Sequence, residues 1–110
     1  MTKLLVVLFF LHLLVACQSE ATKKPSHLIE AEKMSLILEE VLLMESHYQS
    51  KYGIPGVYKD ALDKSLLVIF KKHQITKKQF KESYVFYASQ PETFKALNTS
   101  IMDRLSRQIP

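Results

Sequence analysis

Glycine, proline and cysteine are scarce in this sequence, and each shortage excludes a class of structure. The 110 residues include two glycines, four prolines and one cysteine. A glycine-rich phosphate-binding loop needs more glycine than the chain has, and a single cysteine cannot form an internal disulfide. We therefore expect a fold that is stabilised by packing, and the composition favours helices over a sheet.

The chain also lacks the motifs with which most enzymes hold a metal ion or a nucleophile. It has no paired-histidine zinc spacing and no serine in a nucleophile elbow. After the N-terminal segment the histidines are His27, His47 and His73, which lie on three separate segments. Glu39 and Glu40 are adjacent and point to different faces of a helix, so they do not form an acid and base pair. We expect no catalytic, metal-binding or cofactor-binding residues, and therefore no enzyme.

The one strongly apolar run lies at the N-terminus and is short. Lys3 precedes it, Leu4–Val15 is almost unbroken, and the small residue Ala16 follows. These 12 residues would extend about 18 Å as a helix, against a hydrocarbon core of about 30 Å. A positive residue, a short apolar run and a small residue are typical of a secretory signal. Residues 1–16 are therefore predicted to be a cleaved signal peptide.

The single cysteine directly follows that run. The tetrapeptide Leu14, Val15, Ala16, Cys17 resembles the lipobox of bacterial lipoproteins, in which the cysteine becomes the first residue and carries acyl chains. A thioether needs a nucleophilic sulfur, and two or three acyl chains hold a protein on a bilayer far more stably than one. Cleavage is expected between Ala16 and Cys17, with Cys17 as the lipid attachment site. The alternative is an ordinary signal peptide with an incidental cysteine.

The residues that follow the cysteine have no apolar periodicity. Residues 17–25 are predicted to form a flexible tether, of which the stretch QSEATKKP can extend to about 25 Å. Lipoproteins that stay in an inner membrane commonly carry Asp after the cysteine, whereas Gln18 stands here. The lipobox resemblance therefore implies a lipid-anchored protein of the outer membrane, on a face that the sequence leaves open.

Apolar residues recur at intervals of three and four through the rest of the chain, which predicts amphipathic helices. The strongest break is KYGIPGV, residues 51–57, which holds both glycines and predicts the main loop. Core-facing stripes are expected over residues 30–48, over residues 58–73 and on a last helix that ends near Arg107. These stripes are Met34, Ile37, Leu38, Val41, Leu42 and Tyr48, then Tyr58, Leu62, Leu66, Ile69 and Phe70, then Phe94, Leu97, Ile101 and Leu105.

Two polar signals mark the remaining helix starts. Thr76 with Gln79, and Ser89 with Glu92, have the spacing of capping boxes. Pro91 suits the first turn of the helix that the second signal begins. A third helix is therefore expected from Thr76 and a fourth from Ser89.

The third helix carries an aromatic stripe of Phe80, Tyr84 and Tyr87 at spacings of four and three. Such a stripe can be a ligand platform, but we expect it in the core. The short turn HQIT, residues 73–76, predicts that the second and third helices are antiparallel neighbours. The predicted fold is all-α, with a small bundle of three to four amphipathic helices in residues 26–110.

Charge is unevenly distributed over these helices. Five glutamates lie between Glu30 and Glu45 against Lys33 alone, whereas eight lysines between Lys51 and Lys81 face two aspartates. The acidic helix is expected to pair with the basic middle inside the fold, and a partner-binding patch is the alternative. The lysines of residues 71–81 are expected to solvate a turn. Anionic lipid headgroups or an acidic partner are the alternative targets, and nucleic acid is not expected as a partner.

Two long stretches follow the lipobox, LIEAEKMSLILEEVLLMES and IFKKHQITKKQFKESYVFYASQPETFKALNTSIMDRL. Together with the lipobox they resemble a family of small Bacteroidetes-type outer-membrane lipoproteins, domain-of-unknown-function family 4296, and the resemblance covers nearly all of residues 25–105. Its most specific part is the set Ile75, Thr76, Gln79, Phe80, Ser83 and Tyr87, followed by Pro91. The resemblance implies a helical lipoprotein of the outer membrane or periplasm, and it transfers neither an activity nor catalytic residues.

Two functions are compatible with these features. We favour a non-catalytic interaction module, held on the membrane by acyl chains on Cys17, whose surface binds a protein partner in the cell envelope. The helix, QIT turn and Phe-bearing helix also look like the helical chaperone portion of periplasmic prolyl foldases. A chaperone-like binder of unfolded polypeptide would expose some of the aromatic stripe together with Leu43, Met44 and Phe86. An open apolar groove would favour the chaperone, and a polar surface over a buried stripe would favour a fixed partner.

Overall fold

The chain is helical wherever its structure is regular. The structure, a computed structural model, describes residues 2–16 and 23–109, and side chains over residues 2–9 and 23–109. Its helices are α1 Thr2–Ala16, α2 Ala31–Tyr52, α3 Pro55–Lys72, α4 Lys77–Ala88 and α5 Pro91–Gln108. The all-α prediction is confirmed. The helix count differs from the predicted three to four, because the apolar run at the N-terminus is also a helix and four more follow it.

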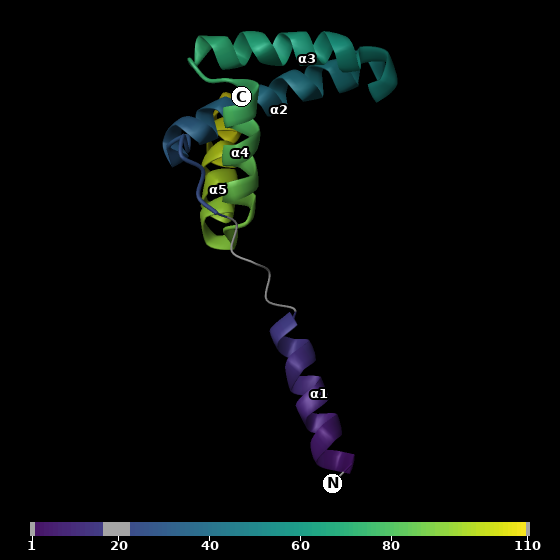
Figure 1. Ribbon diagram of the computed structural model, residues 1–110. Coiled ribbons are helices and arrows are strands. Elements are labelled where there is room, and N and C mark those ends of the chain that lie inside the picture. Colours follow the sequence, from purple (N-terminus) through teal and green to yellow (C-terminus); the bar gives the residue numbers. More distant parts are fainter. Residues whose placement is uncertain (1, 17–22, 110) are drawn as a thin grey trace.

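Helices α2 to α5 form two antiparallel hairpins that cross (Figure 1). In one hairpin α2 runs back along α3, and in the other α4 runs back along α5. The first part of α2 lies against α5, whereas its second part extends away with α3. The prediction that the second and third helices, α3 and α4, are antiparallel neighbours is wrong, since α3 lies across the end of α4.

Helix α2 is the central helix, because it packs against both α3 and α5. Its stripe is buried as predicted at Met34, Ile37, Leu38 and Val41, whereas Leu42 is exposed. The other stripes also face the core. Their buried members are Tyr58, Ile69 and Phe70 on α3, and Leu97 and Ile101 on α5.

The turn between α2 and α3 is shorter than predicted. Only Gly53 and Ile54 lie outside a helix, so the loop predicted over residues 51–57 is mostly helical. Gly53 has φ 75°, a left-handed conformation that glycine adopts without steric cost, and its N–H bonds to the carbonyl of Gln49. Pro55 then begins α3, where its fixed φ suits a first helical residue. The hairpin is tight for these two reasons.

The bend between α3 and α4 is a Schellman motif, a helix end in which one left-handed residue closes two backbone hydrogen bonds. The N–H of Gln74 bonds to the carbonyl of Lys71, and the N–H of Ile75 bonds to the carbonyl of Phe70, both at 3.0 Å. Phe70 and Ile75 are buried in the same core cluster, which supplies the apolar contact of this motif. The motif turns the chain sharply, and this explains why α3 and α4 cross.

The two predicted capping boxes have different outcomes. Thr76 caps α4, since its Oγ1 accepts a hydrogen bond from the N–H of Gln79 at 3.0 Å, but the Gln79 side chain bonds elsewhere. The second box is wrong. Ser89 is the last cap of α4 and its hydroxyl donates to the carbonyl of Phe86, while Gln90 precedes Pro91 at the start of α5. The two-residue connection leaves Ser89 within reach of the unpaired carbonyls of α4.

Replacement of Gln74 tests the Schellman motif. Gln74 has φ 59°, and a side chain in this conformation costs about 1 kcal/mol that glycine does not. We expect Gln74→Gly to raise the free energy of unfolding by about 0.5 to 1 kcal/mol, and Tm by about 2 to 8 °C in thermal unfolding followed by circular dichroism. Gln74→Ala, which keeps the Cβ, should leave Tm near that of the native chain. Equal Tm values for the two variants would contradict the motif.

Candidate functional site

The segment that leads into the domain, residues 26–30, is held by one face of α4; we call it the entering segment. The N–H of Ile29 donates to the Ser83 hydroxyl at 3.0 Å, and the carbonyl of Ile29 accepts from the Tyr87 hydroxyl at 2.5 Å. One turn earlier on α4, the Gln79 amide donates to the carbonyl of His27 at 3.0 Å. Gln79, Ser83 and Tyr87 are spaced by four, so they form one row along the helix.

The two bonds to Ile29 are structural because their groups are buried away from water. Ile29 is 3% exposed and Ser83 is fully buried, and a buried peptide group without a partner is costly. Burial, together with the negative charge of Glu30, raises the pKa of the Tyr87 hydroxyl above its usual value, which keeps it a donor. Just before this segment, Lys23 to Pro25 lie beside Glu82 on the next face of α4. The tether therefore joins the domain at a fixed place on α4.

The predicted core stripe of α4 is only partly buried. Tyr87 is in the core, and Phe80 is half-buried with its ring stacked on Phe70 at 4.8 Å between centroids. Tyr84 is 38% exposed, so its prediction as a core residue is wrong. The entering segment covers the Tyr87 side of α4, and Tyr84 lies outside that cover, against Phe80 and Phe94.

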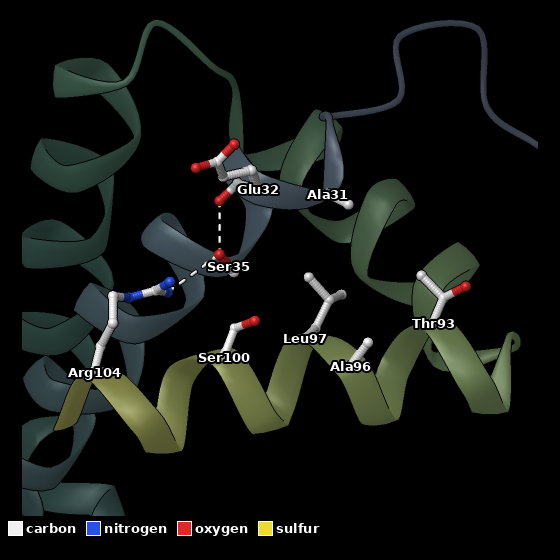
Figure 2. Close-up of a pocket in the computed structure, with 8 residues that line it drawn as sticks. All are labelled: Ala31, Glu32, Ser35, Thr93, Ala96, Leu97, Ser100 and Arg104. Atoms are coloured by element: carbon white, nitrogen blue, oxygen red, sulfur yellow. Dashed lines mark hydrogen bonds between the residues drawn. The ribbon is translucent and has the colours of Figure 1, made fainter. Parts of the chain in front are cut away.

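A cleft of about 340 Å³ lies between the start of α2 and the face of α5 from Thr93 to Arg104 (Figure 2). Small side chains line most of it, and Arg104 reaches from α5 across its end toward α2. Nη2 of Arg104 donates to the Ser35 hydroxyl at 3.1 Å, and that hydroxyl donates to the carbonyl of Glu32 at 2.7 Å. The small residues of the lining are Ala31, Ser35, Thr93, Ala96 and Ser100.

The charge at this cleft is neutralised within the domain. Nε of Arg104 lies 2.7 Å from Oε2 of Glu39, a side chain only 9% exposed, and the Gln108 amide donates to the other oxygen at 3.3 Å. A buried carboxylate needs such partners, because without them its desolvation would cost several kcal/mol. This pair was not predicted. The position of Glu39 beside the apolar stripe of α2 was a signal that its carboxylate would be buried and would need a partner. Glu39 and Arg104 join α2 to α5 and leave neither charge free.

A second ion pair joins α2 to the end of α3. Nζ of Lys72 donates to Oε1 of Glu40 at 2.8 Å, and Nε2 of His73 lies 3.2 Å from the other oxygen, outside hydrogen-bond geometry. Burial raises the pKa of the Glu40 carboxyl, but the neighbouring Lys72 and His73 outweigh this and bring the pKa below its usual value. The predicted pairing of the acidic helix with the basic middle is confirmed at this point.

The three histidines do not share a site. His27 is exposed in the entering segment, His47 is exposed on α2, and His73 is half-buried at the end of α3. Within the described residues, no three histidine, cysteine or acidic side chains lie close enough to hold a metal ion. Glu39 and Glu40 likewise bind different partners on different sides of α2.

Apolar side chains are exposed on one face of α2, which adjoins α3 at Leu43. Leu36 and Leu43 are 42% and 47% exposed, and their spacing of seven places them on one face of α2. Leu43 lines a depression of about 480 Å³ with Met44 and His47 of α2 and Ile69 of α3. We call this face, with Leu36, Leu43 and the depression, the seam surface.

The predicted lipid site lies beyond the described side chains. Cys17 is outside the described residues, as is most of the predicted tether, and Ala16 is the last residue of α1 with an undescribed side chain. The described side chains of α1 include exposed apolar ones over residues 4–9, which are 52% to 72% exposed. Among residues 2–16 and 23–109, no helix combines the length and hydropathy needed to cross a membrane.

Removal of one hydroxyl tests the contact between α4 and the entering segment. Tyr87→Phe would leave the buried carbonyl of Ile29 without a partner, so we expect a loss of about 1 to 3 kcal/mol in the free energy of unfolding, measured by urea denaturation. The matched control is Tyr84→Phe, which removes a hydroxyl from an exposed tyrosine of the same helix and should change stability by less than about 0.5 kcal/mol. Equal losses would show that the contact is unimportant.

Comparison with known proteins gives a family and no relative of known activity. A family model described as Domain of unknown function (DUF4296) matches residues 25–109. No curated protein and no solved structure matches the chain. The matched range contains the entering segment, helices α2 to α5 and every buried residue of the described core.

Proposed function

The chain belongs to the DUF4296 family, a domain of unknown function, and from this premise we propose that it is a lipid-anchored cell-envelope protein whose helical domain binds a protein partner without catalysis. The family brings no activity with it, so the proposal depends on the residues of this chain. The binding role is inferred from the seam surface. The lipid anchor is inferred from the lipobox.

The anchor is supported by the order of features at the N-terminus. The 15-residue helix α1 has apolar side chains exposed over residues 4–9, the lipobox follows, and Cys17 precedes the first described residue of the domain side, Lys23, by six positions. A lipid on Cys17 would hold the domain close to a bilayer, because the tether spans at most about 25 Å. Gln18 after the cysteine favours the outer membrane.

The seam surface supports binding of one fixed partner. Its exposed leucines lie beside the Glu40 and Lys72 ion pair, so apolar area is bordered by charges of both signs, which is typical of the core and rim of a protein interface. Most side chains of the seam come from α2, whose position is fixed by the core. A preformed surface of this kind loses little entropy when a partner binds.

A non-catalytic role is supported by the state of the charged groups. Glu39 is bound by Arg104, and Glu40 is bound by Lys72 with His73 beside it. A general acid or base must be able to reach a substrate proton. These carboxylates instead join helices to one another.

The chaperone-like role is less well supported. Its predicted cradle would combine Leu43 and Met44 with aromatic residues of α4. Leu43 and Met44 line the seam depression, whereas Phe80 lines a different cavity between α3 and α4 and Tyr87 is buried. Apolar side chains divided in this way offer small separate contacts rather than one groove for an extended polypeptide.

Loss of the thiol tests the anchor. We expect Cys17→Ala to abolish incorporation of radiolabelled palmitate and to leave a precursor that retains residues 1–16, while the helical circular-dichroism spectrum is unchanged. The control is Ser19→Ala, which alters the tether and keeps the cysteine. A native protein that takes up no palmitate, or whose mature form begins elsewhere than Cys17, would contradict the anchor.

Site-specific photo-cross-linking tests the partner surface. We expect a benzophenone amino acid in place of Leu43 to give one adduct of defined mass in whole cells, because the seam surface would contact a single partner. The same amino acid in place of Gln49, exposed six residues later on another face of α2, should give none. Equal adducts from both positions would contradict the seam surface, and a ladder of many masses from Leu43 would support the chaperone-like role instead.

A further inference from the structure

A cavity of about 380 Å³ lies in the bend where α3 crosses the start of α4; we call it the elbow pocket. Its lining combines apolar side chains with lysines from both helices. We propose that the elbow pocket binds a small anionic amphiphile, a molecule with one apolar chain or ring and one carboxylate or phosphate group. This proposal concerns a site other than the seam surface, and it would hold even if Cys17 carried no lipid.

The floor of the elbow pocket is apolar. Phe70 and Phe80 stack there with ring centroids 4.8 Å apart and an interplanar angle of 29°, and Leu66 adds an aliphatic wall. Phe80 and Leu66 are only half-buried, so part of their apolar surface faces the cavity. Small-molecule sites measure about 300 to 1,000 Å³. A cavity of about 380 Å³ therefore suits one chain or ring better than a two-chain lipid.

The rim of the elbow pocket is basic. Lys59 comes from α3, and Lys77 and Lys81 come from α4, where their spacing of four places them on one side. Over residues 2–9 and 23–109, none of these three lysines lies within 4.0 Å of a carboxylate in an ion pair. Asp63 is the one acidic residue of the lining, so three ammonium groups face one carboxylate and the rim has a net charge of +2.

The start of α4 adds to this positive field. Lys77 is the first residue of the helix, where the aligned peptide dipoles give a partial positive charge. An anion at the rim would therefore be attracted both by the lysine ammonium groups and by the N-terminal end of α4. Lysines that only solvate a turn need no apolar floor beneath them, and the stacked phenylalanines are what distinguish this site from a solvated turn.

The elbow pocket is preformed by the bend itself. The Schellman motif fixes the crossing of α3 and α4, and the burial of Phe70 and Ile75 holds both ends of the bend in the core. Phe80 also stacks on Tyr84, which is 38% exposed, so an apolar tail longer than the cavity would continue over an aromatic surface. A ligand would therefore find both walls in place before it binds.

Photoaffinity labelling tests the proposal on the full-length Cys17→Ala chain in dodecyl maltoside, where no acyl chain of the protein can compete. The probes are palmitic acid with a diazirine in its tail, the corresponding hexadecanol and the corresponding hexadecyl phosphate. We expect the acid, the phosphate or both to label the peptides that contain Leu66, Phe70 and Phe80, as mapped by mass spectrometry, about tenfold more than the alcohol does. The anionic probe that labels these peptides more strongly identifies the head group that the elbow pocket prefers.

Variants of the rim lysines separate the contribution of charge to ligand binding from the contribution of apolar contact. The double variant Lys77→Gln, Lys81→Gln should reduce this labelling about tenfold. Lys78→Gln is the matched control, because Lys78 is on the same turn, points to Glu82 and does not line the pocket; it should leave the labelling unchanged. Equal labelling by the alcohol, labelling that survives the double variant, or labelling confined to α1 would overturn the proposal. Circular dichroism of each variant excludes unfolding as the cause of a loss.

Discussion

The arrangement of this domain depends on how a non-helical segment is buried against a helix. At Ile29 the chain passes through the core before α2 begins, and there its peptide N–H and C=O cannot bond to water. The Ser83 hydroxyl accepts from the N–H of Ile29 and the Tyr87 hydroxyl donates to its C=O, which satisfies both groups at once. Because these side chains belong to α4, the start of α2 and the position of α4 are fixed together.

This requirement explains the part of the sequence that looked most like a family signature. Thr76 caps α4, and Gln79 and Ser83 bond to the backbone of the entering segment. Ile75 is buried at the bend between α3 and α4, and Phe80 packs against the same core. Each of these residues has an architectural task within this fold. A short, specific motif in a domain of unknown function can therefore record how the chain is held together rather than what it acts on.

The helices themselves could be predicted from the sequence, and their arrangement could not. Apolar spacing is a local signal, so the stripes on α2, α3 and α5 were located correctly apart from Leu42, which is exposed. The crossing of α3 and α4 depends on one left-handed residue, and glycine, the usual marker of that conformation, is replaced by Gln74. Tyr84 and Tyr87 share the same periodicity, and only the path of the entering segment decides that Tyr87 is buried and Tyr84 exposed. The pairing of Glu39 with Arg104 likewise joins residues that are 65 positions apart.

Helix α2 connects the proposed anchor to the proposed binding surface. It has 22 residues, about 33 Å of continuous helix, with the entering segment at its start and the seam surface along its middle. The ion pair of Glu39 with Arg104 joins its middle to α5, and that of Glu40 with Lys72 joins it to the end of α3. A domain attached to a bilayer next to Ile29 would therefore present Leu43 about 18 Å along α2 from its first residue. Since the elbow pocket lies on α3 and α4 rather than on the seam, a ligand there and a partner on the seam surface could be bound at the same time.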